Sequence, residues 1–172
     1  MNSHDSMETG RWIESVVERY EGRLLRYASQ ITGDVDRGRD VVQDTFLRLC
    51  REPPANVDGH LAEWLYTVCR NRALDVRRKE KRMQTMTDEQ NVTQPSREPS
   101  QADSAERQDT AQHVLQLVEG LSENQQEVVR LKFQNGLSYK EISRITELSV
   151  SNVGYLIHTA IRKLRTQLGV EG

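Results

Sequence analysis

Apolar residues recur every three or four positions between residues 137 and 168, in two runs separated by a short turn. Ser138 and Glu141 have the S-x-x-E spacing of a capping box, so a helix is predicted to begin at Ser138. Ser149 offers an N-cap for the second, longer run. Two helices joined in this way form either a helix-turn-helix, whose second helix lies in the major groove of DNA, or a helical hairpin of any bundle.

The same period continues upstream. It predicts helices over residues 10–32 and 36–51, and a third that runs into a basic stretch ending at residue 82. Residues 113–119 are also expected to be helical, and Ser122 with Gln125 forms a further capping box for a helix ending near Gly136. The chain has only four prolines, and charged residues make up 29% against 5% aromatic. We therefore expect an all-α fold.

Residues 83–112 depart from this pattern. They are rich in Gln, Ser and Asp, include two prolines and contain almost no large apolar side chain. Such a segment buries too little surface to offset the entropy lost on ordering. The sequence therefore predicts a flexible tail at 1–9, a helical domain at 10–82, a flexible acidic linker at 83–112, and a helix-turn-helix domain at 113–172.

The net charge of −2 conceals an uneven distribution. Residues 83–112 carry two basic and six acidic side chains, whereas residues 70–82 carry seven basic and two acidic ones. Local density of this kind, not a basic average, makes a phosphate-binding stripe. A nucleic-acid partner is therefore compatible with the acidic total.

Cys50 and Cys69 lack the spacing of a zinc site and are expected to be two buried thiols. The sequence has neither an apolar run of 18 residues nor a signal-peptide core, so we expect a soluble, intracellular protein. Residues 1–82 hold no carboxylate cluster, metal-ligand spacing or partnered nucleophile, which argues against a DNA-processing enzyme.

Two motif sets in this chain closely resemble the extracytoplasmic-function (ECF) sigma factors of bacterial RNA polymerase, in the sigma-70 family. The first half contains LLRYASQITGDVDRGRDVVQDTFLRLCR and HLAEWLYTVCRNRALDVRRKEKR, and the second contains LVEGLSENQQEVVRLKFQNGLSYKEISRI and SVSNVGYLIHTAIRKLR. A helix-turn-helix alone is a weak signal. Both sets, in the family's order across a linker of suitable length, are a specific one.

The resemblance implies that the first domain docks on the β′ clamp helices of core polymerase and opens the minus-ten element. The implied docking surface consists of Asp40, Gln43, Asp44 and Leu47. The implied minus-ten contacts are Arg70, Asn71, Arg72, Arg77, Arg78 and Lys79. Asn71 stands where the family has an asparagine near the pocket for an unpaired base. An amide suits this role because it can both donate to and accept from a base edge. The basic side chains would hold phosphates, which position DNA without specifying sequence.

The resemblance also implies that the helix from Ser149 reads the minus-thirty-five element. Candidate contacts to bases or backbone are Ser151, Asn152, Tyr155 and His158, and candidate phosphate contacts are Arg162, Lys163 and Arg165. The chain departs from the family where Lys or Arg is common, because it has Gly154, Tyr155, Leu156, Thr159 and Ile161 there. This helix could instead meet a protein. Glu147 occupies a turn position that usually holds a glycine in the left-handed conformation. Holding a non-glycine residue in that conformation costs about 1 kcal/mol.

The implied partners are core RNA polymerase (β′ clamp helices and β flap), promoter DNA and an anti-sigma factor. We expect no catalytic residue, cofactor, metal or membrane insertion, and a cytoplasmic location, on the nucleoid when the chain is bound to polymerase. The main alternative is a stand-alone helix-turn-helix regulator, which would not need the acidic docking surface or Asn71. A protein-binding helical adaptor explains neither the basic run nor the helix-turn-helix.

Overall fold

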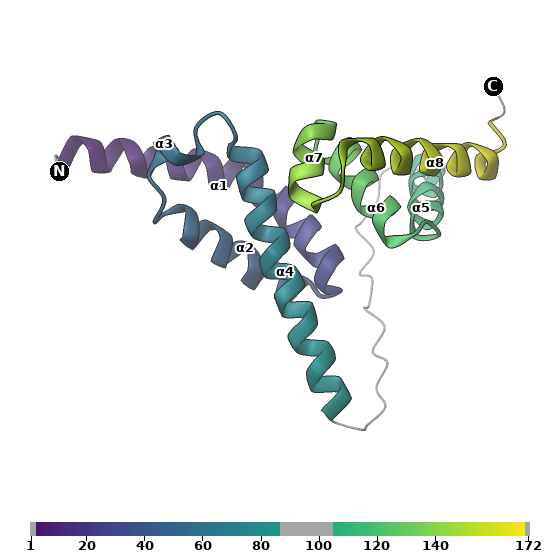
Figure 1. Cartoon of the computed structure of the whole chain (residues 1–172), viewed down its shortest axis with the longest axis horizontal. Helices are drawn as coiled ribbons and strands as arrows, with labels where there is room; N and C mark the ends of the chain where they lie inside the picture. The colour runs from purple at the N-terminus through teal and green to yellow at the C-terminus, as the bar shows by residue number, and fades with distance from the viewer. Residues whose placement is uncertain (1–2, 87–104, 171–172) are drawn as a thin grey trace. The chain divides into compact units, whose positions relative to one another are not determined.

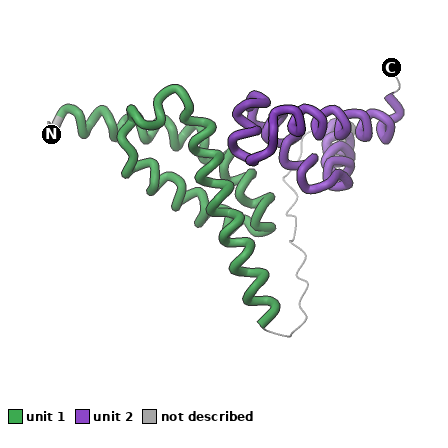
Figure 2. The backbone as a smooth tube through the Cα atoms, in the orientation of Figure 1, with its two compact units in different colours: residues 1–95 green, residues 96–172 purple. Residues whose placement is uncertain are grey.

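The computed structural model describes the backbone of residues 3–86 and 105–170. The chain divides into two compact units, residues 1–95 and 96–172 (Figure 2). Every regular element in the described ranges is helical, and the second unit contains the helix-turn-helix. The predicted all-α fold of two helical domains is therefore confirmed. None of the described helices is both long and apolar enough to cross a membrane.

The first unit consists of α1 (Ser3–Thr32), α2 (Val35–Leu49), the short α3 (Pro54–Val57) and α4 (Leu61–Met86) (Figure 1). α1, α2 and α4 pack against one another. Tyr27 of α1 and Tyr66 of α4 meet edge to face, with ring centroids 5.4 Å apart. The fully buried side chains of this core include Leu24, Ala28, Val41, Leu49, Val57, Leu65 and Ala73.

The turn between α1 and α2 brings these helices very close together. Gly33 ends α1 with φ +75°, and the side chain of Asp34 accepts a hydrogen bond from the Arg37 N–H to cap α2. One turn into α2, a Cβ on Gly38 would lie 2.4 Å from Ser29 Oγ and 3.0 Å from the Ser29 nitrogen. The lack of a side chain at Gly38 thus sets the α1–α2 distance.

Two ion pairs join α2 to α4 across this unit. Arg37 pairs with Glu80, and Arg72 Nε donates to Asp44 Oδ2 at 2.8 Å. Arg37 and Asp44 are seven residues apart on α2, and Arg72 and Glu80 are eight apart on α4, so the two helices run antiparallel. α4 continues past this contact, and residues 81–86 are all exposed.

The second unit consists of α5 (Ala105–Glu119), α6 (Glu123–Val129), the π-helical stretch η1 (Arg130–Gln134), α7 (Tyr139–Thr146) and α8 (Val150–Leu168). Both predicted capping boxes, at Ser122 and Ser138, have their two reciprocal hydrogen bonds. Ser149 caps α8 by accepting from the Asn152 N–H. The buried core of this unit includes Leu121, Val128, Leu131, Leu137, Ile142, Ile145, Val153, Ile157 and Ala160.

The prediction of a plain α-helix up to Gly136 is wrong in its last turn. Over η1 the backbone widens, and both the N–H and the side-chain amide of Asn135 donate to the Arg130 carbonyl, at 3.2 and 3.1 Å. Within this stretch, the Lys132 ammonium lies 5.2 Å from the ring centroid of Tyr139 at the start of α7. Gly136 has the expected positive φ, +66°.

The predicted helix ends next to these segments were also wrong. α1 begins at Ser3, inside the expected tail, while α4 runs to Met86 and α5 begins at Ala105, inside the expected linker. The prediction ended each helix where its apolar stripe ends. Once a helix has nucleated, however, each further residue adds one hydrogen bond, so the helix can continue beyond its apolar stripe. The remainder of the predicted linker, residues 87–104, lies outside the described residues.

The two cysteines differ in environment. Cys69 is fully buried beside the Leu24 carbonyl, and burial raises the pKa of its thiol to about 12. Cys50, at the C-cap of α2, is exposed, so the expectation of two buried thiols is wrong for Cys50. Its position follows Leu49, the last buried residue of α2, and therefore faces away from the core.

The turn of the helix-turn-helix holds Glu147 in the left-handed region, at φ 62° and ψ 15°, as expected. Glu147→Gly is expected to raise the free energy of unfolding of the second unit by about 1 kcal/mol, because glycine adopts this conformation without steric cost. Urea denaturation followed by circular dichroism measures the change.

Gly136→Ala provides the control of opposite sign. Gly136 has a similar φ, and a Cβ there would meet nothing within 4 Å, so only the backbone conformation is penalised. We expect this variant to lose about 1 kcal/mol. A loss of stability in Glu147→Gly would mean that the glutamate side chain stabilises the turn by more than its conformation costs.

Candidate protein and nucleic-acid interfaces

The predicted docking residues form one stripe on α2. The stripe begins at Asp40, and Gln43, Asp44 and Leu47 follow it by three, four and seven residues. All four side chains are exposed. The opposite side of α2 carries the buried residues Gly38, Val41, Val42, Thr45 and Leu49. Leu47 is 52% exposed, an apolar side chain on an otherwise polar stripe. The structure thus brings all four predicted residues together on the side of α2 that does not face the core.

The predicted minus-ten residues do not share one side of α4. They fall into three pairs, each seven residues and thus about two turns apart: Arg70 with Arg77, Asn71 with Arg78, and Arg72 with Lys79. Asn71, Arg78 and Lys79 are exposed, whereas the other three are partly buried. α4 therefore presents basic groups on three adjacent sides, and only Arg78 shares the side of Asn71.

Several of these cations have acidic partners. The Arg72 guanidinium pairs with Asp44 of the docking stripe, and Arg78 Nη1 lies 3.4 Å from Asp75 Oδ1, one turn earlier on α4. The side chains of these two pairs are 41–67% exposed, so each pair contributes at most about 1 kcal/mol. Such pairs exchange readily for other charged partners.

A groove of about 370 Å³ lies between α2 and α4 and joins the docking stripe to the side of Asn71. Its lining residues are Asp44, Thr45, Leu47, Arg48, Arg51, Val68, Asn71, Arg72 and Asp75. The predicted sites omitted five of these residues, namely Thr45, Arg48, Arg51, Val68 and Asp75. Arg51 stands four residues after Leu47, and this spacing could have extended the stripe. The position of Val68 on the wall of the groove follows only from the packing of α4 against α2.

The second unit presents a separate exposed stripe along α8. Five of the seven predicted contacts lie on it, namely Ser151, Tyr155, His158, Arg162 and Arg165. Asn152 is exposed but turned away from this stripe by its position in the helix. Lys163 is turned further, and its Nζ donates to the Gly120 carbonyl at 2.9 Å. In the structure Lys163 thus caps the C-terminal end of α5 and lies off the stripe.

The run of α8 that lacks the family's basic residues mostly faces its own unit. An ideal Cβ on Gly154 would lie 3.6 Å from the ring of Tyr139, and the Thr159 hydroxyl accepts from Gln125 Nε2 at 3.1 Å. Leu156 and Ile161 are partly buried, whereas Tyr155 is 66% exposed. Four of these five positions therefore lie off the exposed stripe, so the lack of Lys or Arg at them leaves the charge of the stripe unchanged.

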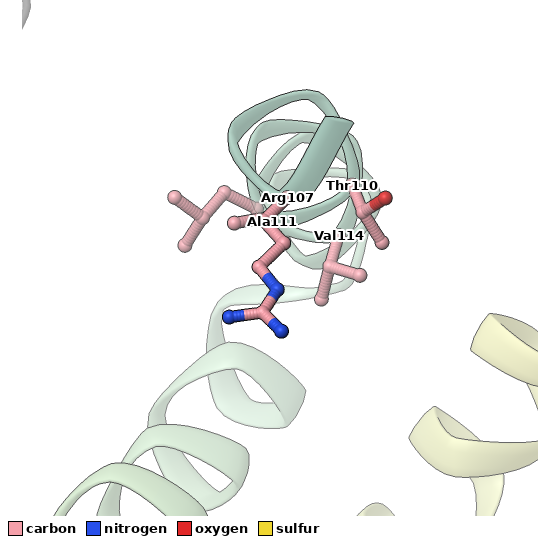
Figure 3. Close-up of a pocket in the computed structure, with 5 residues that line it drawn as sticks. Arg107, Thr110, Ala111 and Val114 are labelled. Carbon is pink, nitrogen blue, oxygen red and sulfur yellow. The ribbon is translucent and has the colours of Figure 1, made fainter. Parts of the chain in front are cut away.

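A larger hollow, of about 710 Å³, opens along α5 (Figure 3). It is lined by Arg107, Thr110, Ala111, Val114 and Leu115, all from this one helix. Val114 and Leu115 are 36% and 41% exposed. The hollow is an open apolar strip with one charged side chain, so it lacks the convergent polar groups of a small-molecule site.

Comparison with known families gives two matches, one in each unit. The family described as Sigma-70 region 2 matches residues 16–83, and the family described as Sigma-70, region 4 matches residues 111–164. The first match contains the docking stripe and all the predicted minus-ten residues, and the second contains all of η1 and α7 and most of α8.

Whole-chain comparisons agree. The ECF RNA polymerase sigma factor SigL of Mycobacterium tuberculosis is 30% identical over 162 residues, covering 91% of this chain and 88% of SigL. SigM of Bacillus subtilis is 24% identical over 159 residues, covering 89% and 93%. The fold is similar to that of the sigma factor RpoE from Bartonella quintana, solved with the anti-sigma factor NepR, with a TM-score of 0.71, 22% identity and coverage of 92% and 98%. The chain belongs to the ECF sigma factors of RNA polymerase, in the sigma-70 family.

Proposed function

We propose that this sigma factor divides its work between its two units. The first unit docks on core RNA polymerase through the α2 stripe and opens the minus-ten element with α4. The second unit holds the minus-thirty-five element with α8. The observation that carries the proposal is that Asp40, Gln43, Asp44 and Leu47 form one exposed stripe opposite the buried side of α2. A stand-alone regulator would have no use for this stripe or for the region 2 match.

Within the first unit, Asn71 reads an unpaired base and the basic side chains of α4 hold phosphates. Asn71 is exposed at the groove, where an amide can donate and accept along a base edge. Unstacking a base costs only a few kcal/mol once the strands separate. Arg78 and Lys79 are exposed for backbone contacts, which set position but not sequence.

Within the second unit, the exposed stripe of α8 approaches the major groove. Ser151, Tyr155 and His158 contact bases or backbone, and Arg162 and Arg165 contact phosphates. The free N–H groups at the start of α8 add a favourable site for a phosphate. This upstream contact is modest in affinity because few charges lie at the beginning of the helix.

The polymerase supplies the chemistry, and this chain supplies binding energy for promoter recognition and melting without a catalytic group of its own. It acts in the cytoplasm, on the nucleoid when it is bound to the polymerase. The β flap is proposed as a second polymerase contact. The complex of RpoE with NepR supports an anti-sigma partner for this chain as well.

The test is transcription in vitro with purified core polymerase on a library of promoters from the source genome. The holoenzyme formed with this chain is expected to start at specific promoters that core polymerase alone does not use. If no promoter-specific transcript appears, the proposed function is wrong.

The division between reading and positioning gives a prediction about two residues on one side of α4. Asn71→Ala is expected to change selectivity at one base of the minus-ten element. Arg78→Ala is expected to weaken all promoters alike and to reduce the salt dependence of binding by about one unit of slope. Transcription from templates with every base at each minus-ten position measures selectivity and promoter strength, and promoter binding at several salt concentrations measures the slope. If both variants lower all promoters equally, Asn71 does not read a base.

A further inference from the structure

Asp44 belongs to two surfaces at once. It is a member of the α2 docking stripe, and its Oδ2 accepts from Arg72 Nε of the DNA-binding helix at 2.8 Å. Asp40, one turn earlier on the same stripe, has no ion pair or hydrogen bond through its side chain in the described part of the chain. A carboxylate beside a guanidinium neutralises charge that would otherwise attract a phosphate. In the free protein, Asp44 therefore neutralises part of the positive charge of α4.

The Asp44–Arg72 pair is also easy to displace. Its side chains are 46% and 41% exposed, so water and salt compete with the contact. The fold does not depend on it alone, because Arg37 and Glu80 join α2 to α4 elsewhere. Arg72 can thus exchange Asp44 for another anion without separation of the two helices.

The groove beside this pair has the chemistry to receive a cationic side chain. Leu47 and Val68 provide apolar wall against which the stem of an arginine or lysine can lie. Asp44 and Asp75 provide carboxylates for its charged head. The groove is also lined by three arginines, Arg48, Arg51 and Arg72. An incoming cation can therefore bind there only if it replaces one arginine as the ion-pair partner of a carboxylate.

We propose that a cationic side chain of the docked polymerase enters the groove between α2 and α4, replaces Arg72 on Asp44, and so frees Arg72 to bind promoter phosphate. The proposal rests on the proposed function, since it assigns the docking partner to the α2 stripe. It makes polymerase docking raise the DNA affinity of α4 by exchange of one ion pair. Docking and DNA binding thereby become coupled through Asp44.

The first test measures DNA binding by the free full-length chain, with a fluorescent duplex that has a single-stranded minus-ten region. Asp44→Asn is expected to tighten binding about 2- to 5-fold, the range of a released exposed ion pair. It is also expected to steepen the salt dependence by about 0.7 to 0.9 units, the value for one additional phosphate contact. Asp40→Asn removes the same charge from the same stripe but releases no arginine, so its gain should be smaller and its salt slope unchanged.

Two further measurements identify the exchange. In an Arg72→Gln background, Asp44→Asn should give no more gain than Asp40→Asn does. In holoenzyme assembled with saturating core polymerase, the advantage of Asp44→Asn over the unmodified chain should disappear, because docking has already freed Arg72. Equal gains from Asp44→Asn and Asp40→Asn, or an advantage that persists in holoenzyme, would overturn the exchange.

The result for the unmodified chain separates the two proposals. If its holoenzyme starts at specific promoters but Asp44→Asn behaves as Asp40→Asn does, the exchange alone is wrong. If no promoter-specific transcript forms, the proposed function is wrong, and the exchange is wrong with it.

Discussion

Truncation of Leu47 to alanine is expected to weaken binding of core RNA polymerase about 30-fold, which corresponds to about 2 kcal/mol. Leu47 is the one large apolar side chain of the docking stripe, and it is 52% exposed in the free protein. An apolar side chain in the middle of an interface contributes most when the surrounding polar groups exclude water from it. Titration of labelled core polymerase measures the change in affinity.

Val35→Ala is the matched control. Val35 lies on the same helix and is equally exposed, at 52%, but it is twelve residues from Leu47 and thus about a third of a turn away from the stripe. This variant is expected to bind polymerase within about twofold of the unmodified chain. Alanine is a strong helix former, so neither variant should unfold α2. Equal losses in the two variants would show that the docking stripe is not the contact.

Substitution of Gly38 by alanine is expected to lower the free energy of unfolding of the first unit by about 2 kcal/mol. The added Cβ would lie 2.4 Å from Ser29 Oγ, and 3.0 and 3.1 Å from the Ser29 nitrogen and Cα, so α1 and α2 would have to move apart. Intrinsic helix propensity favours alanine by about 1 kcal/mol, which offsets only part of this cost. Urea denaturation followed by tryptophan fluorescence measures the change.

Gly22→Ala separates the clash from helix propensity. Gly22 lies inside α1, and a Cβ there would meet nothing within 4 Å, so we expect a gain of about 1 kcal/mol. In a Ser29→Ala background the cost of Gly38→Ala should fall but not vanish, because the contacts to the Ser29 backbone remain. Ser29 Oγ is buried without a hydrogen-bond partner in the described residues, so its removal should cost little. Equal effects at Gly38 and Gly22 would contradict the close approach.

The sequence alone determined where most of the helices lie, the serine caps of the second unit and the family. Ser122, Ser138 and Ser149 cap the helices that they were predicted to cap, and Glu147 adopts the predicted left-handed turn. These features involve hydrogen bonds or steric contacts within about four residues, so local spacing specifies them. The same holds for the docking stripe, since helical spacing is enough to place its residues on one side of α2.

Only the tertiary structure decided which charges are free and which are paired. Arg72 and Lys163 were both predicted to contact DNA, but Arg72 pairs with Asp44 across 28 residues and Lys163 binds the Gly120 carbonyl across 43. The π-helical turn before Gly136 and the exposure of Cys50 were likewise not predicted. Spacing within one helix says which side a residue lies on, but its partner there depends on how another helix packs against that side. The groove between α2 and α4 exists for the same reason, because it forms only where two helices distant in sequence meet.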